Sequence, residues 1–500
     1  MHSELALGSS LAGPGEAQRL REAGQLASAA GICGALLERD PAHAQALCIL
    51  GRTLLDVARH ARATHDGMAA LADASGADET WAAPRAEREW LEEAEGLLRR
   101  ATCADPSSVD AHLYLGRALA RLARFGEADA EIRRAVALDR GNADLHLALA
   151  DTQRSAGDYP GATATLERLV EHEPANVVAH LNLFATLYIS GDYRRAWAEN
   201  EWRLQGSPPP YPQPLWDGSS LEGRAILLLA EGGLGDQIQF VRWARNLRER
   251  GGRVIVQCPG TLRRLMLTCP GVDEVPETGA ELPHFDVQVW SGSLPHLLGF
   301  DSLGSIPAEV PYLHADPRQV ERWRTILGRF TGLRVGVNWA GNRYNLPGHN
   351  REIPFESFLA LAEVPGVRLF SLQKGVGAEL LEGKPADVSI ADLGTYFVDM
   401  ADTAAAIAAL DLVVTNDTSI AHVAGALGRP VWLVLPRQAC WRWQRGRDDC
   451  PWYPTMRLFR QRWDGTWGEV FAEVADALAR EAALHAVAGA PRAEPVAACA

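Results

Sequence analysis

The chain has 500 residues, 47% of them hydrophobic, and a formal net charge of −14. This length is too great for one ordinary core and predicts about three domains of roughly 100–200 residues each. The acidic excess is spread along the chain and argues against nonspecific nucleic-acid binding, which depends on dense positive charge. The N-terminus lacks the features of a secretory signal, and no stretch approaches about 18 apolar residues. We therefore expect a soluble, cytoplasmic protein without integral membrane association.

Eight cysteines are scattered along the chain and form neither a CxxC pair nor a Cys/His cluster. Because a disulfide framework or a zinc site needs closely spaced ligands, free thiols explain this pattern better. A reducing cytoplasm is the compartment that such thiols indicate.

A repeat of 34 residues runs without gaps through residues 105–205. It aligns three dipeptides, three histidines and three aromatic residues: Asp105-Pro106, Asp139-Arg140 and Glu173-Pro174; His112, His146 and His180; Phe125, Tyr159 and Tyr193. This period and the aromatic residue at the turn between helices resemble tetratricopeptide repeats. Each unit would be a helix pair that stacks on its neighbours to form a concave groove.

The array extends towards the N-terminus. An earlier unit begins at Asp40-Pro41, and we interpret residues 60–86 as an insertion before its second helix. A half-repeat at 17–39 would cap an array that spans 17–205, after a disordered segment at 1–16. The recurring histidines favour packing or a groove lining over metal ligation, because one per repeat spaces them a full unit apart. This half shows no catalytic residues and predicts a groove for a polypeptide partner.

A proline-rich segment, GSPPPYPQPLWDGSS, follows the repeats and predicts an extended linker at 206–221. Strand–helix alternation then starts at AILLL and predicts one α/β lobe at 222–330. A second alternation from LRVGVNWAG predicts another lobe at 331–483, followed by a disordered tail at 484–500. The expected fold class is α + α/β, a helical solenoid followed by two Rossmann-like lobes.

The first lobe opens with a glycine-rich turn, AEGGLGDQIQF, directly after its first strand. Many nucleotide-binding folds begin in this way, but the spacing matches neither the dinucleotide fingerprint nor the Walker loop. Asp236 lies where a phosphate would meet the helix amides, and a carboxylate there would repel it. Asp236 therefore either caps the helix or takes part in chemistry beside the nucleotide.

The second lobe contains the string LDLVVTNDTSIAHVAGALGRPVWLVLP. A buried strand ends at Val414 and a helix begins near Thr418 or Ser419, so free amides and hydroxyls at the helix start would suit a diphosphate. His422, one turn into the helix, could face the same anion. Two alternatives stay open: the same residue types are preferred helix caps, and His422 could be an ordinary core residue.

Six tryptophans and three interleaved arginines lie between 432 and 467. They are Trp432, Trp441, Trp443, Trp452, Trp463, Trp467, Arg442, Arg445 and Arg447. Aromatic faces stack on sugars and arginines bind phosphates, yet strand and turn positions favour core packing for most of these tryptophans.

Several strings together carry a family resemblance: LLLAEGGLGDQIQFVRWA, VGVNWAGNRYN, REIPFESF, LFSLQKG, DTAAAIAALDLVVTNDTSIAHVAGALGRPVW and CPWYPTMRLFRQ. They resemble bacterial proteins in which tetratricopeptide repeats precede a two-lobed glycosyltransferase domain of GT-B type. That domain is similar to the ADP-heptose:lipopolysaccharide heptosyltransferases. By architecture the chain is also similar to the O-linked N-acetylglucosamine transferases, in which repeats present the acceptor protein. The resemblance covers the repeats and nearly all of 222–475.

The resemblance implies roles for the matching residues, with Asp236 as the general base. It implies a donor-binding set made of Gly233, Gly235, Trp339, Gly341, Asn342, Arg351, Ser371, Gln373, Lys374, Asp417, Thr418, Ser419 and His422. The cation of the phosphate loop falls on Arg343 or Arg351. Ser419 stands where the heptosyltransferases favour glycine, and no lysine accompanies the phosphate loop, so lipopolysaccharide is not implied as the acceptor.

These observations predict a glycosyltransferase that uses a nucleotide-sugar donor and a protein acceptor held by the repeats, with flagellin as one setting that the resemblance implies. No Asp-x-Asp occurs between 222 and 480, so we expect no metal and no cofactor, with a helix dipole and arginines in their place. Two alternatives stay open. One is a heptosyltransferase-like enzyme acting on a saccharide or lipid precursor, and the other is a non-catalytic scaffold.

Overall fold

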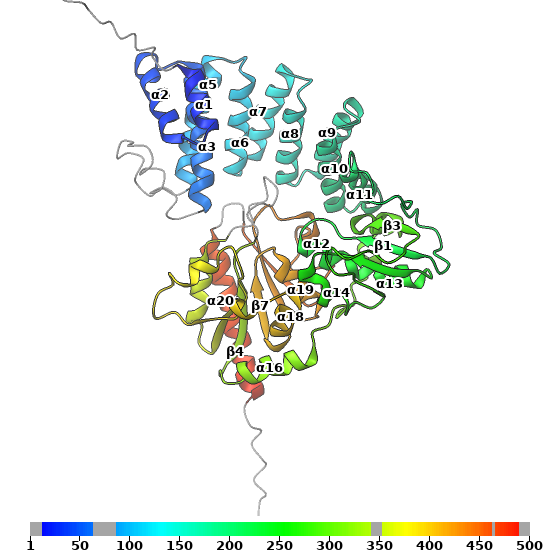
Figure 1. The fold of residues 1–500 in the computed structure, drawn as a ribbon. Coiled ribbons are helices and arrows are strands. Elements are labelled where there is room, and N and C mark those ends of the chain that lie inside the picture. The colour runs from blue at the N-terminus through cyan, green and yellow to red at the C-terminus, as the bar shows by residue number, and fades with distance from the viewer. Residues whose placement is uncertain (1–12, 64–86, 342–352, 463–465, 490–500) are drawn as a thin grey trace, which may run out of the picture. The chain divides into compact units, whose positions relative to one another are not determined.

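The structure is a computed structural model that describes residues 13–63, 87–341, 353–462 and 466–489 (Figure 1). The chain divides into two compact units, 1–186 and 187–500. This division falls inside helix α10 (Val177–Ser190), earlier than the 205/206 boundary expected from the repeat pattern. The reason is that the segment after residue 186 packs on the α/β half of the chain, where the Asn200 side chain donates to the Gly292 carbonyl at 3.1 Å.

Antiparallel helices make up the first unit. They are α1 (Pro14–Glu22), α2 (Leu26–Arg39), α3 (Ala44–Ala63), α5 (Glu87–Ala104), α6 (Val109–Arg121), α7 (Phe125–Leu138), α8 (Ala143–Ala156), α9 (Tyr159–His172) and α10. The first helices of successive repeats start at 109, 143 and 177, and the second helices start at 125, 159 and 193. Both series keep the 34-residue step, which confirms the tetratricopeptide solenoid.

The recurring histidines make one hydrogen bond each of the same kind. The Nε2 atom of His112 lies 3.1 Å from the Pro106 carbonyl oxygen, and His146 and His180 reach Arg140 and Pro174 at 3.0 Å. Each ring therefore ties its helix to the turn six residues earlier. This contact agrees with the packing interpretation of these histidines.

Two of the expected domain boundaries differ from the helix bounds in the structure. Helix α1 begins at Pro14, so residues 14–16 are helical and not part of a disordered segment, because proline suits the first turn of a helix. Helix α20 (Trp467–Gly489) likewise includes residues 484–489 of the expected tail, because its alanine-rich sequence contains no helix breaker before Pro491. Most of the proposed insertion at 60–86 lies outside the described residues.

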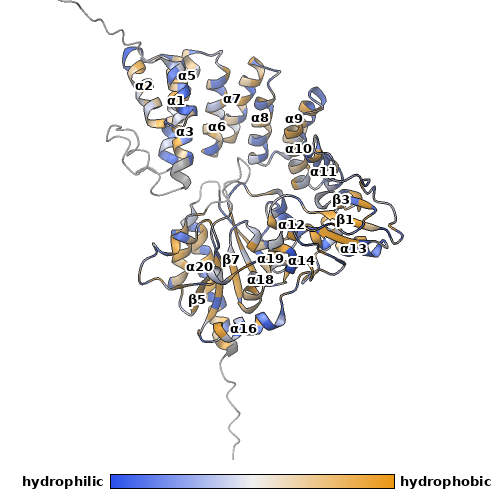
Figure 2. Cartoon of the chain, viewed as in Figure 1, coloured by the Kyte–Doolittle hydropathy of each residue, from blue (hydrophilic) through white to orange (hydrophobic). Residues whose placement is uncertain are grey.

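The first lobe of the second unit is a three-stranded parallel sheet in the order β2-β1-β3. Its elements are β1 (Ala225–Leu229), α12 (Leu234–Phe240), α13 (Ala244–Glu249), β2 (Arg253–Gln257), α14 (Gly260–Met266), β3 (Val287–Trp290) and α15 (Leu294–Leu297). All residues of β1 are buried, and Figure 2 shows this strand as predominantly hydrophobic. Such a continuous apolar run is typical of a parallel strand covered on both faces.

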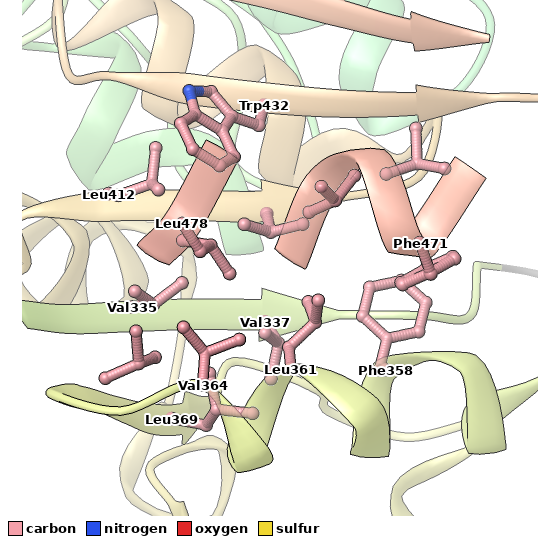
Figure 3. Close-up of a cluster of buried hydrophobic side chains, with 14 of the residues drawn as sticks. Val335, Val337, Phe358, Leu361, Val364, Leu369, Leu412, Trp432, Phe471 and Leu478 are labelled. Atoms are coloured by element: carbon pink, nitrogen blue, oxygen red, sulfur yellow. The ribbon is translucent and has the colours of Figure 1, made fainter. Parts of the chain in front are cut away.

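The second lobe is a six-stranded parallel sheet in the order β6-β5-β4-β7-β8-β9. Its strands are β4 (Leu333–Asn338), β5 (Val367–Ser371), β6 (Ile390–Asp392), β7 (Leu412–Thr415), β8 (Val431–Leu435) and β9 (Met456–Arg460). The described helices of this lobe are α16 (Pro317–Leu327), α17 (Phe355–Leu359), α18 (Met400–Ala409), α19 (Ser419–Ala426) and α20. Phe471 of α20 packs on Phe358 of α17, with ring centroids 4.8 Å apart, in a core that also contains Trp432 (Figure 3).

The two lobes contact each other through α12 against α19 and α14 against α18. Arg264 of α14 forms ion pairs of 3.2 and 3.1 Å with Asp399 and Asp402 at the start of α18. The backbone N–H of Tyr312, between the lobes, donates to the carbonyl of Ala426 at 3.0 Å. The expected helical solenoid followed by two Rossmann-like α/β lobes is confirmed.

Candidate functional site

The glycine-rich turn joins β1 to α12 and presents Asp236 in the first turn of that helix. Gly232 has a φ of +70°, a conformation that favours glycine. The N–H of Gly233 donates to Asp236 Oδ2 at 2.7 Å, so this carboxylate caps its own helix. The capping role that the sequence allowed is therefore present.

Asp236 has a second partner from the other lobe. Its Oδ1 atom accepts a hydrogen bond from the Arg442 guanidinium, which also donates to Gln239 Oε1. The side chain of Arg442 is only 11% exposed, whereas that of Asp236 is 31% exposed. Burial lowers the pKa of Arg442, but Asp236, Cys440 and Asp417 together outweigh this effect and raise the pKa above its usual value.

Arg442 is a residue that our sequence analysis did not assign to the site. It stood out only as a basic residue in a tryptophan-rich stretch. No sequence pattern connects it with Asp236, because the two residues lie 206 positions apart. The core interpretation of the tryptophans is confirmed for Trp432, Trp443 and Trp452, which are at most 8% exposed. Trp463 lies outside the described residues.

His422 is buried in α19, directly against the glycine-rich turn. Its Nδ1 atom lies 2.8 Å from the hydroxyl of Tyr453. A Cβ added to Gly235 would come within 2.6 Å of His422 Cδ2 and 3.1 Å of Nε2, so the glycine permits this close approach. Burial first, and then the positive charge of Arg442, lower the pKa of His422 from 6.5 to about 4, so the imidazole is neutral near pH 7.

The start of α19 is the second part of the site. Thr418 precedes the helix with an extended backbone (φ −132°), and its side chain makes no capping hydrogen bond to the helix. The Thr418 hydroxyl donates instead to Asn338 Oδ1 at 2.8 Å. Asp417 is buried and Ser419 is half-buried. The helix start thus keeps amides that the Thr418 side chain does not occupy, as an anion site requires.

Gly341 follows strand β4 and lies beside this helix start. A Cβ at Gly341 would come within 3.1 Å of Thr418 Cγ2. The structure therefore brings Gly341 together with Thr418, as the resemblance implied. The other residues expected on this loop, Asn342, Arg343 and Arg351, lie outside the described residues.

Gln373 and Trp339 have their side-chain polar atoms bonded to the protein itself. Gln373 Oε1 accepts from Asn338 Nδ2 at 2.6 Å and from the N–H groups of Trp339 and Ala340 at 3.2 and 3.1 Å. The indole N–H of Trp339, a residue 1% exposed, donates to the Gly377 carbonyl at 3.0 Å. These contacts indicate that both residues hold the loop after β4 and do not point a free polar group at a ligand.

The strand end around Gln373 supplies two further expected residues. Ser371 is buried, and its Oγ atom accepts from the N–H of Gln373 at 3.2 Å. Lys374 is exposed, and its ammonium group donates to the carbonyl of Phe397. Among the described residues there is no group of three or more His, Cys, Asp or Glu side chains placed to hold a metal ion.

The fold defines a helical repeat protein with a two-lobed α/β domain. Two family profiles agree with this class. Residues 124–181 match the tetratricopeptide repeat profile, and residues 396–433 match glycosyltransferase family 9 (heptosyltransferase). The second match begins just after β6 and runs through α18, β7 and α19 into β8. The chain therefore matches tetratricopeptide repeats in its helical half and glycosyltransferase family 9 over a short part of its second α/β lobe, and the second match supports sugar transfer.

Individual proteins are similar to this chain at low sequence identity. Protein FlbA of Caulobacter vibrioides (strain ATCC 19089 / CIP 103742 / CB 15) is 25% identical over 298 residues, which cover 53% of this chain and 48% of FlbA. The chain thus spans about half the length of the curated relative it matches. A family 9 glycosyltransferase from Veillonella parvula DSM 2008 is 14% identical, with a TM-score of 0.39, covering 52% of this chain and 98% of that one. E. coli ADP-heptose lps heptosyltransferase II is 16% identical, with a TM-score of 0.38, covering 51% and 99%.

The hydropathy of the helices adds one observation. Within the described ranges, every helix is either too short or too polar to cross a membrane.

Proposed function

We propose that this chain is a glycosyltransferase that moves a sugar from a nucleotide-sugar donor to an acceptor. The single observation that carries the proposal is the contact between the lobes at Gly235 and His422. This contact sets α12, which carries Asp236 of the first lobe, against α19, which begins at Thr418–Ser419 of the second lobe. Sugar transfer needs both a base and an anion site, on opposite sides of the sugar.

Asp236 is the proposed general base. An acceptor hydroxyl must lose its proton as it attacks the sugar, and a partly exposed carboxylate can take it. Arg442 orients this carboxylate, because its enclosed and permanently charged guanidinium is hydrogen-bonded to it.

The start of α19 is the proposed diphosphate site. Its amides and helix dipole stabilise the negative charge of the leaving nucleotide. His422 contributes a neutral imidazole, with Nδ1 bonded to Tyr453 and Nε2 on the side of Gly235. Gly341 leaves room beside Thr418 for the same anion. In this proposal no metal takes part, since the helix dipole and arginine supply the positive charge.

The proposed acceptor is a protein held by the tetratricopeptide repeats, and flagellin is the first to test. The repeats support this, because tetratricopeptide arrays form concave surfaces that bind partners. A second candidate, transfer to a saccharide or lipid precursor, is favoured by the heptosyltransferase description of the matched family. We place the reaction in the cytoplasm; the seven cysteines among the described residues, all of them free, support a reducing compartment.

Thermal-shift measurements with nucleoside diphosphates and nucleotide sugars, with and without EDTA, test the donor site. A ligand at 100 times its Kd adds about 2.7 kcal/mol to the free energy of unfolding, which raises Tm measurably. Ser419→Asp should abolish the shift, because it adds a carboxylate where the diphosphate binds. The matched control is Ser108→Asp at the start of α6, where the substitution keeps a helix cap and should leave the shift intact.

Mass spectrometry of acceptors incubated with the stabilising nucleotide sugar tests the reaction. A mass increase of one sugar on flagellin supports the protein acceptor, whereas an increase only on a saccharide or lipid precursor supports the second candidate. If no nucleotide shifts Tm and no acceptor gains a sugar, the chain is a scaffold and the proposal is wrong.

A further inference from the structure

The last part of the repeat sequence belongs structurally to the α/β half. Helix α11 (Tyr193–Asn200), the 3-10 helix η2 (Glu201–Leu204) and the final turn of α10 all fall within the unit 187–500. We call residues 187–204 the terminal repeat segment. This segment contacts a neighbour of each residue of the Asp236–Arg442 pair: Glu231 on the Asp236 side and Trp441 on the Arg442 side.

The first contact fixes the entry to the glycine-rich turn. Arg203 forms a two-point ion pair with Glu231, with Nε and Nη2 lying 2.9 and 2.8 Å from the two carboxylate oxygens. Glu231 directly precedes Gly232 and also accepts from the N–H of Gly292 at 2.6 Å. The side chains of Arg203 and Glu231 are 17% and 19% exposed, so water screens this pair only weakly. The start of the turn that presents Asp236 is therefore anchored to the terminal repeat segment.

The second contact fixes the residue next to Arg442. The ring of Trp441 lies edge-to-face against Tyr188 and Trp197, with centroid distances of 4.6 and 5.6 Å. Tyr188 and Trp197 are both buried. The Arg442 guanidinium lies 4.3 Å from the centroid of Trp441, a cation–π contact. The position of Trp441 therefore sets where the guanidinium of Arg442 can lie.

We propose that the terminal repeat segment positions the candidate base. Arg203, which belongs to this segment, and Trp441, which packs on it, are positioning residues that act through Asp236. Arg203 holds the turn that carries the carboxylate, and Trp441 holds the cation that orients it. A catalytic group must be held within a fraction of an ångström, and a support from two sides achieves this. The inference rests on the proposed function, because it is the proposed reaction that makes Asp236 a base.

Hydrogen exchange of the full-length chain tests the positioning without any substrate. Arg203→Gln and Trp441→Ala should each speed exchange of the Gly233 amide about tenfold, because this N–H is protected by the Asp236 carboxylate. Trp441→Phe should restore most of the protection, since phenylalanine can keep the edge-to-face contact. Unchanged exchange in both variants would overturn the inference.

Two matched controls separate positioning from general loss of stability. Arg334 forms a similar two-point pair with Asp411, at 2.9 and 2.8 Å, at the start of β4, so Arg334→Gln removes an equivalent ion pair elsewhere. Trp467 is a partly buried tryptophan at the start of α20, so Trp467→Ala removes an equivalent ring. Neither control should change exchange of the Gly233 amide.

Kinetics of the same variants test whether the two residues act through the base. Each should lower kcat about tenfold and leave the KM for the nucleotide sugar nearly unchanged, whereas in an Asp236→Asn background neither should lower kcat further. Equal losses in both backgrounds would overturn positioning through Asp236. If the wild-type chain transfers no sugar, the proposed function fails, and the exchange measurement still decides whether the segment positions Asp236.

Discussion

The carboxylate of Asp236 in the first α/β lobe is hydrogen-bonded to the guanidinium of Arg442 in the second. The arginine is enclosed, while nearly a third of the aspartate side chain remains exposed. The carboxylate is therefore the more accessible member of the pair. Because each lobe supplies one partner, the pair depends on the two lobes being in contact.

We expect Asp236→Asn to lower kcat about 10²–10⁴-fold, the usual contribution of a general base. Affinity for the nucleotide sugar should change little, since the proposed diphosphate site belongs to the other lobe. Steady-state kinetics and calorimetric titration of the donor measure the two effects. Full activity in the variant would show that Asp236 only caps its helix and is not the general base.

The same substitution leaves Arg442 without its carboxylate, which should reduce the free energy of unfolding because an enclosed charge loses its partner. The control is the double variant Asp236→Asn/Arg442→Gln, in which no unpaired charge remains. We expect it to recover part of the lost stability in urea unfolding but none of the lost kcat.

We expect Gly235→Ala to destabilise the chain by about 1–3 kcal/mol, the usual cost of an overpacked contact. The new methyl group would meet the His422 ring at 2.6 Å, and this ring is held by Tyr453. Alanine is the better helix former, so a higher Tm would show that the His422 ring moves to accommodate the methyl group and that the prediction is wrong. Gly233→Ala is the matched control, since its methyl group would have an ordinary contact of 3.5 Å with Asp236 Oδ2.

His422 should make stability depend on pH below neutrality. Its pKa is about 4 in the folded chain and 6.5 in the unfolded chain, so the unfolded state binds a proton first as the pH falls. The contribution is complete above pH 6.5 and is lost towards pH 4, by roughly 2 kcal/mol between pH 7.5 and pH 5. Asp417 and Asp236 oppose the lowered pKa, whereas Arg442 and Arg242 reinforce it.

His422→Gln removes the titrating group and keeps a polar side chain near Tyr453. Unfolding of wild type and variant, compared at the two pH values, isolates this contribution from that of other groups. Parallel pH profiles for the two proteins would show that His422 has the same pKa in the folded and the unfolded chain.

Gln373→Leu should lower the free energy of unfolding by about 3 kcal/mol or more in the absence of any nucleotide. The reason is that Asn338 and the N–H groups of Trp339 and Ala340 lose their shared acceptor in a buried place. Differential scanning calorimetry of the unliganded chain measures the loss. An unchanged Tm together with lost nucleotide binding would instead support the direct donor contact that the family resemblance implied.

Much of the local structure could be predicted from the sequence. The 34-residue period gave the starts of the repeat helices from 109 to 193, because a stacked helix pair repeats its buried positions at a fixed spacing. Apolar runs such as AILLL predicted the parallel strands, and the glycines after them predicted the turns at the strand ends. Asp236 and His422 could be identified because each lies in the first turns of the helix that directly follows such a strand.

Other features depended on the tertiary structure. Strand β6 has three residues and strand β9 contains two arginines, so only their pairing with β5 and β8 makes them strands. The Asp236–Arg442 pair and the contacts of Arg203 and Trp441 join residues far apart in the chain. No local pattern encodes such pairs.

The sequence by itself thus determined the repeat solenoid, the two α/β lobes and the residue types at the strand ends, because these follow from backbone geometry within a few turns of chain. Only the tertiary structure decided which cation faces Asp236, that Gln373 and Trp339 support the loop after β4, and that the terminal repeat segment belongs to the α/β half. These outcomes depend on which surfaces meet when the elements pack, and packing is a property of the folded chain as a whole.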